Sequence, residues 1–237
     1  WLVLEAGLGG RLDATTAHGF RPLIAVASVG MDHREHLGDS LDAIAAEKAA
    51  AISEGAHVIS AAQEPEVAAV LEQRVNDVNG TLQWVHALDA SWTLGLPGAW
   101  QKRNGAVAAA ALQWMSTRNH AITNQAIRQG FASARWPGRL QWMRWRGLRL
   151  RVDGAHNPPA ATELARERLS WSSSGTAQTW ILAIQSQKQA PEMLQRLLGS
   201  DDEAWIVPVP GHRSWSVEQL QQALPLQEHQ LKAADNA

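Results

Sequence analysis

Short apolar runs alternate with stretches of helical periodicity along the first part of the chain. Strand-like runs fall at 1–4, 23–30 and 57–60, and helical patterns lie at 40–53 and 64–78. This alternation is typical of βαβ units, because a parallel strand needs a crossover to reach its neighbour. The pattern therefore predicts an α/β fold with a mainly parallel sheet.

A second round of the same pattern follows a break in the chain. Behind a loop-rich stretch at 79–103, helices are predicted at 105–115 and 123–131, and Trp136-Pro137-Gly138 then punctuates the sequence. We therefore predict two domains, 1–136 and 137–237. The second has expected strands at 147–153, 179–184 and 204–209 and expected helices from 158, at 190–198 and at 216–223. The polar tail at 226–237 gives no sign of a closing strand.

Composition narrows the classes of function. The chain has no Cys, which excludes disulfides, thiolate zinc sites and cysteine nucleophiles and favours the cytoplasm. A formal net charge of −2 gives no overall basic field for nucleic acid, and no apolar run reaches the length of a membrane span. One arginine cluster alternates with apolar residues and is interpreted as the solvent face of a strand: Arg144, Arg146, Arg149 and Arg151.

Polar residues follow two of the predicted strands at the point where each ends. Glu5 stands in LEAGLGGRLDAT, and Asp32 and His33 follow the strand at 23–30. Ligands of α/β proteins bind at the carboxyl edge of the sheet, where a carboxylate and an imidazole could share a hard cation. A plain glycine turn and a capping role explain these residues about equally well, so both interpretations stay open.

Lys48 falls on the apolar stripe of the helix at 40–53, because Ile44 and Ile52 lie four residues before and after it. A buried ammonium is costly unless it is paired or discharged. Either its stem reaches to the edge of the helix, or the lysine lies beside a charged ligand. The pattern does not separate these two alternatives.

A turn between strand and helix is a common place for nucleotide contacts, and RVDGAHNPPA has this layout. Asp153 ends the strand, and His156 and Asn157 occupy the turn. Asn and Asp also favour turns for local reasons. Asn104 in QKRN and Arg139 in WPGRLQ indicate little alone.

Five segments in this order resemble one family: LEAGLGGRLDAT, SVGMDHREHLGDSLDAIAAEKAAAI, QKRN, WPGRLQ and VDGAHNPPA. They are similar to the bifunctional dihydrofolate synthase/folylpolyglutamate synthase of the Mur ligase superfamily. The resemblance implies an incomplete Mur-type central ATPase domain followed by a smaller Rossmann-like α/β domain. It also implies a cytoplasmic monomer, and an N-terminally truncated fragment without the phosphate-binding loop, inactive alone.

The resemblance also implies roles for single residues. Glu5 and His33 would bind magnesium, and Lys48 would be carbamylated. Asn104, Arg139 and Asp153 would contact ATP, and His156 would order the cleft as a catalytic residue. Three departures concern substrate handling: Thr16 stands where Asn is usual, Trp100 where His is usual, and Gln189 where an acid is usual.

The implied activity is the ATP-dependent addition of L-glutamate to dihydropteroate or folate through an acyl phosphate. Two alternatives remain at this point. One is a Mur-type ligase acting on a cell-wall precursor, and the other is a non-catalytic binding module derived from such a ligase. The substrates expected are ATP, L-glutamate and dihydropteroate or a folate.

Overall fold

The computed structural model of the protein describes residues 2–118, 122–171 and 176–234. Its contacts divide the chain into two compact units, Trp1–Asp153 and Gly154–Ala237. The division follows Asp153, whereas the sequence suggested a boundary at Trp136-Pro137-Gly138. The boundary between functional domains therefore stays a prediction. None of the helices in the described ranges is long and apolar enough to cross a membrane.

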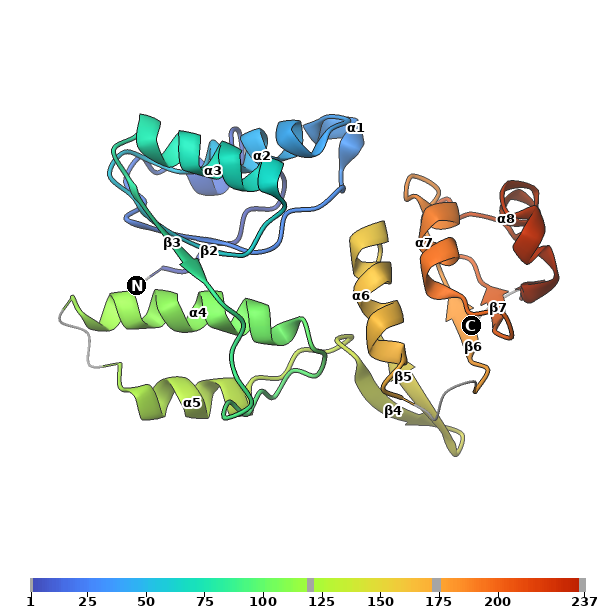
Figure 1. The fold of residues 1–237 in the computed structure, drawn as a ribbon. Helices are drawn as coiled ribbons and strands as arrows, with labels where there is room; N and C mark the ends of the chain where they lie inside the picture. The colour runs from blue at the N-terminus through green and yellow to red at the C-terminus, as the bar shows by residue number, and fades with distance from the viewer. Residues whose placement is uncertain (1, 119–121, 172–175, 235–237) are drawn as a thin grey trace. The chain divides into compact units, whose positions relative to one another are not determined.

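The first unit is built on a parallel three-stranded sheet in the order β1-β2-β3 (Figure 1). Its strands are β1 (Leu23–Val26), β2 (His57–Ala61) and β3 (Thr81–Val85). Its α-helices are α1 (Arg34–Leu37), α2 (Leu41–Ala49), α3 (Pro65–Asp77), α4 (Gln101–Ser116) and α5 (Asn124–Ser133). The predicted α/β class with a parallel sheet is confirmed, and α2, α3, α4 and α5 lie where the periodicity placed them.

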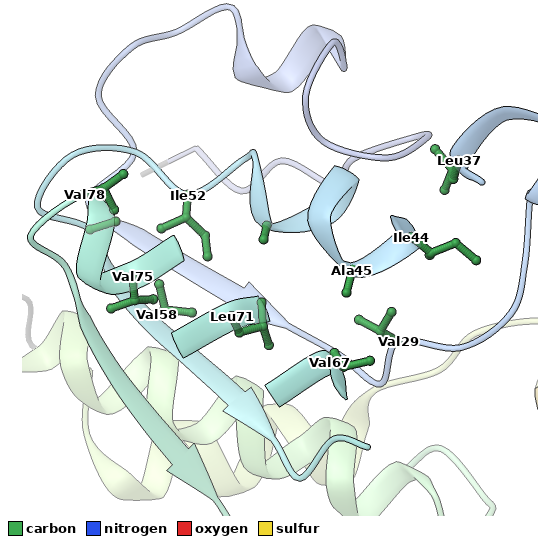
Figure 2. Packing of buried hydrophobic residues seen from close by; sticks show 12 residues of the cluster. Val29, Leu37, Ile44, Ala45, Ile52, Val58, Val67, Leu71, Val75 and Val78 are labelled. Carbon is green, nitrogen blue, oxygen red and sulfur yellow. The ribbon is translucent and has the colours of Figure 1, made fainter. Parts of the chain in front are cut away.

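Helices cover both faces of this sheet because the side chains of its central strand alternate. Val58 packs with α2 and α3, whereas Ile59 and Ala61 pack with Val107 and Ala110 of α4. Figure 2 shows the first of these clusters. The four-residue spacing of Val67, Leu71 and Val75 keeps one stripe of α3 against β2, and all three are at most 3% exposed.

An antiparallel hairpin follows, with β4 (Gln141–Trp145) paired to β5 (Leu148–Val152). Arg146 and Gly147 join the strands with φ angles of 48° and 85°, the positive values that a two-residue hairpin turn requires. The sequence predicted a single strand at 147–153. The first strand was missed because its five residues are all exposed and form no apolar run.

The second unit has a parallel sheet in the order β6-β7-β8. Its strands are β6 (Thr179–Leu182), β7 (Glu203–Ile206) and β8 (Leu231–Ala233), and its helices are α6 (Pro158–Arg168), α7 (Ala190–Leu197) and α8 (Val217–Ala223). Leu194, Leu220 and Ala204 are fully buried in its core. Two short 3-10 helices, η1 (Ala14–Thr16) and η2 (Pro225–Gln230), complete the elements of the two units.

Three expectations about strands are wrong. Residues 2–4 form no strand: Leu2 and Val3 are 78% and 89% exposed, and nothing in the described chain pairs with them. A strand needs a hydrogen-bonded neighbour as well as an apolar sequence. The stretch 79–103, which was expected to be a loop, contains β3, a largely exposed strand at the edge of the sheet. The polar tail, in which no strand was expected, contains the three-residue β8.

Candidate functional site

The glycine-rich segment after residue 5 folds around one carboxylate. Asp13 Oδ2 accepts hydrogen bonds from the backbone amides of Gly7 (2.8 Å) and Leu8 (3.0 Å), and Oδ1 accepts from the Thr15 amide (2.9 Å) and hydroxyl (2.6 Å). The Thr15 hydroxyl and then the Leu8 and Thr15 amides hold the pKa of Asp13 well below its usual range. The loop is thus closed by an ionised side chain, since each donor favours the charged form.

This loop packs against the end of α2. A Cβ on Gly10 would lie 2.8 Å from the carbonyl oxygen of Lys48 and 2.9 Å from that of Glu47, so only glycine allows the approach. Arg11 Nε also donates to Glu47 Oε1 at 2.8 Å. The structure therefore brings the GLGG segment and the predicted functional lysine to one place, through the backbone at Lys48.

Lys48 itself lies at the edge of the core. Its side chain is half-buried between Ile44 and Ile52, which are both fully buried. In the part of the chain that the structure describes, its ammonium has no hydrogen bond or ion pair. An aliphatic stem along the apolar stripe with its head at the boundary agrees with both alternatives drawn from the sequence.

Asp32 and His33 follow β1 at its carboxyl end. His33 adopts a left-handed conformation (φ 52°, ψ 37°) at the N-cap of α1, and its Nε2 lies 3.7 Å from Asp32 Oδ2. A non-glycine residue with positive φ is uncommon and costs energy that the surrounding structure must supply. The backbone therefore holds the imidazole beside the carboxylate.

Gln63 fixes the segment that leads to this turn. Its carboxamide oxygen accepts from Val29 N (2.9 Å), and its nitrogen donates to Ala27 O (2.9 Å) and to the buried Ser60 Oγ (3.0 Å). The side-chain amide thus takes the place that a peptide group would occupy if the β1–β2 ladder continued beyond Val26. It positions the chain that carries Asp32 and His33.

Glu5 is exposed, and no hydrogen bond or ion pair joins it to His33 in the described structure. Nor do any three His, Asp or Glu side chains cluster there as metal ligands. Magnesium commonly takes only one or two protein ligands and completes its octahedron with water and substrate phosphates. The carboxylates and the imidazole available here are compatible with that smaller donor set.

The expected nucleotide contacts lie on two further elements. Asn104 is exposed in the first turn of α4, where its Nδ2 donates to the buried Gln101 Oε1 at 3.1 Å. Arg139 is exposed at the foot of the hairpin, and the next residue, Leu140, donates its backbone N–H to Asp153 Oδ2 at 2.9 Å. This bond holds the backbone of Arg139 beside Asp153, so these two predicted residues lie together.

His156 and Asn157 begin the second unit. His156 is exposed and its Nδ1 bonds to the Gly154 carbonyl oxygen at 2.9 Å, while Asn157 Oδ1 caps α6 by accepting from Ala160 N at 2.9 Å. The Pro residues in the first turn of α6 suit this capped start. The turn is locally ordered as the sequence suggested.

Sequence reasoning did not single out Asp13 or Gln63. Asp13 stands four residues after Gly9 and two residues before the Thr15-Thr16 pair, a pattern that indicates a carboxylate accepting backbone hydrogen bonds in a glycine loop. Gln63 carried no such signal, because its partners Ala27 and Val29 are more than 30 residues away.

Comparison with known proteins identifies the class. The Escherichia coli FolC structure in complex with DHPP and ADP superposes with a TM-score of 0.80 at 26% identity, covering 98% of this chain and 56% of that one. The fold is therefore the Mur-ligase-like α/β fold.

Sequence relatives give the family. The dihydrofolate synthase/folylpolyglutamate synthase of Bacillus subtilis is 32% identical over 190 residues, which are 70% of this chain and 44% of that protein. The Escherichia coli enzyme of the same name is 30% identical over 236 residues, 92% of this chain and 54% of that protein. A family model described as the C-terminal domain of dihydrofolate synthetase matches residues 140–209.

The chain belongs to the dihydrofolate synthase/folylpolyglutamate synthase family. It spans about half the length of the curated relatives it matches.

Proposed function

We propose that this protein serves as an ATP-dependent ligase that joins L-glutamate to the carboxylate of dihydropteroate or of a folate. The observation that carries the proposal is the identity of 30–32% to enzymes named for this reaction, over 70% and 92% of this chain. These relatives support a folate substrate over a cell-wall precursor, and an enzyme over a binding module. By family resemblance we expect a monomer in the cytoplasm.

The local geometry supports a nucleotide contact at the foot of the hairpin. Arg139 is exposed there, and in the described chain its guanidinium has no hydrogen bond or ion pair. The Leu140–Asp153 bond fixes the backbone on both sides of the pair. A guanidinium suits phosphate oxygens and a carboxylate suits ribose hydroxyls, so the two residues match a nucleotide chemically. Asn104 adds an amide from α4.

Two residues would hold magnesium, and a third is a candidate for modification. Glu5 and His33 supply the donors, and the metal would neutralise charge on the phosphates. Lys48 has a half-buried side chain, and its ammonium has no ionic partner in the described residues. Its neutral amine would add to carbon dioxide and release a proton, giving a carbamate. This change replaces a cation with an anion and supplies oxygen atoms.

The proposed reaction has two displacements. First, an oxygen of the substrate carboxylate attacks the γ-phosphorus of ATP, the bond to the β,γ-bridging oxygen breaks, and ADP leaves. Next, the glutamate amine attacks the acyl carbon, inorganic phosphate leaves, and the nitrogen loses a proton. Arg139 would stabilise the negative charge that accumulates on the phosphoryl oxygens. His156 would order the adjoining turn.

The test uses the complete product of the reading frame that encodes these residues. ADP should form only when ATP, L-glutamate and either dihydropteroate or a reduced folate are all present. Turnover with a muramoyl peptide in place of the pteridine substrate would refute the folate assignment.

Lys48→Ala tests the lysine in the same assay. Loss of ligation is expected, with partial recovery when short-chain carboxylates and high bicarbonate are supplied. The matched control is Lys232→Ala, which removes a lysine that pairs with Glu203 on the second unit. Full activity of Lys48→Ala would remove any role for this residue.

A further inference from the structure

One face of the hairpin gathers positive charge around a tryptophan. The register pairs Trp142 with Arg151 and Arg144 with Arg149, and residues that pair across an antiparallel ladder point to the same side. Trp142, Arg144 and Arg149 are exposed. Between residues 140 and 152 there are four Arg and no Asp or Glu, in a chain whose net charge is −2.

Like charges directly opposite each other destabilise a strand pair. Arg144 and Arg149 are such a pair, and within the described residues neither has a carboxylate partner. The guanidinium of Arg149 lies 4.4 Å from the centre of the Trp142 ring, and that of Arg151 lies 4.1 Å from it. The ring thus holds two cations close together, an arrangement that a bound anion would stabilise.

A shallow, open depression is lined by Trp142, Arg144 and Arg149, and by Met143, which alternates to the opposite side of β4. The hairpin begins at the Leu140–Asp153 bond, so β4 leads from the proposed nucleotide contact at Arg139 into the basic face. Strand β4 begins at Gln141, two residues after Arg139, and covers on the order of 10 Å from there to Arg144.

The chemistry of the face favours carboxylates over nucleobases. A base would need an open aromatic ring for stacking, and guanidinium groups already occupy the ring of Trp142. The outward N–H donors of Arg form a planar fork that fits a carboxylate with two parallel hydrogen bonds. The ligand class is therefore an oligoanion with carboxylates spaced along a flexible chain.

We propose that the face formed by Trp142, Arg144, Arg149 and Arg151 binds the γ-linked glutamate tail of the folate, and that it recognises tails of several residues. The inference rests on the proposed function, which adds glutamate to folates. A single glutamate near Arg139 does not extend to Arg144, whereas a longer tail does. The face therefore distinguishes long tails from short ones.

Direct binding tests the proposal without turnover. Calorimetric titration of the 237-residue chain with folate monoglutamate and with folate tetra-γ-glutamate should give tighter binding of the longer ligand. In Arg144→Gln/Arg149→Gln this preference should fall by roughly tenfold. Arg146→Gln is the control: it removes one arginine charge from the same hairpin, against two in the double variant, but Arg146 lies over Trp145, whose side chain is on the other face.

Three results would overturn the site. They are an unchanged tail-length preference in the double variant, an equal loss in Arg146→Gln, and equally tight, equally arginine-dependent binding of tripolyphosphate or oligothymidylate. Circular dichroism of the double variant should match the wild type, because both arginines are exposed. Length-dependent binding without any ATP-dependent ligation by the complete protein would refute the proposed function alone. Ligation with binding independent of tail length would refute the site alone.

Discussion

Asp202 should be the most sensitive single carboxylate of the second unit. It is fully buried and accepts four hydrogen bonds: Oδ1 from Arg168 Nη2 and Gln178 N, both at 2.9 Å, and Oδ2 from Gly199 N at 2.9 Å and Trp180 Nε1 at 3.0 Å. The carboxylate thereby joins the end of α6, the start of β6 and the turn before β7. Asp202→Ala removes it and leaves all four donors without their acceptor.

The expected loss of stability follows from the burial of both Asp202 and Arg168. The Arg168 side chain is only 20% exposed, so the variant leaves a largely desolvated cation without an anion. Removing one member of a buried pair costs about 3–5 kcal/mol, and each stranded neutral donor adds to it. We expect a loss of about 4 kcal/mol, nearly three orders of magnitude in the folding equilibrium and a large share of the stability of a small domain.

Native-state amide exchange measures this loss within the second unit. Protection of the β6 and β7 amides should fall by the expected amount, while that of β2 in the first unit stays unchanged. Asp201→Ala is the control, because the neighbouring carboxylate is exposed and should change stability by no more than about 0.5 kcal/mol. A loss below about 1 kcal/mol in Asp202→Ala, or equal losses in both variants, would refute the argument.

Three further predictions concern the candidate site. Gln63→Ala should cost about 2–3 kcal/mol in local protection, because it strands the Val29 amide and two other polar groups, and amide exchange at Val29 measures the loss. Because the pKa of Asp13 is lowered on folding, its carboxylate stabilises the loop fully above about pH 4, and this effect fades as the pH falls toward its folded-state pKa. Amide hydrogen exchange at residues 7–8 should therefore speed up in acid, and Asp13→Asn should abolish this pH dependence. Gly10→Ala should push the loop away from the Lys48 carbonyl and lower the melting temperature.

Each has a matched control. Gln73→Ala removes an exposed glutamine that bonds to Asp77, and Asp39→Asn changes an 86% exposed carboxylate. Gly19→Ala adds a methyl group where nothing lies within 4 Å. An effect of a control equal to that of its partner variant would contradict the corresponding contact as the cause.

The sequence alone predicted those elements whose buried apolar residues recur at a regular spacing. Helix α3 was found because Val67, Leu71 and Val75 repeat along one face, and β2 because both of its faces are covered. Strands β3 and β4 lie at an edge or in the open and bury too little to leave a pattern. Local pattern also cannot supply a pairing partner, which is why the apolar residues 2–4 looked like a strand.

The candidate site was predictable where its residues are neighbours in sequence. Asp32 and His33 lie within one motif. Asp153 and the turn that follows it lie within another. The approach of Gly10 to the Lys48 carbonyl joins residues that are 38 apart in sequence. The hydrogen bonds of Gln63 to Val29 and Ala27 join residues that are 34 and 36 apart. Such contacts are set by the packing of the sheet and its helices, which no local pattern records.

The hairpin differs from both sheets in how far its partners lie apart along the chain. Trp145 pairs with Leu148, whereas Leu23 pairs with His57 and Ala204 with Leu231. Closing a two-residue turn takes microseconds, and distant parallel pairings form much more slowly. During refolding from the denatured state we therefore expect the arginine-bearing hairpin to be complete while the β1–β2–β3 sheet is still assembling. It would be among the first structured parts of the molecule that a chaperone or a ligand could meet.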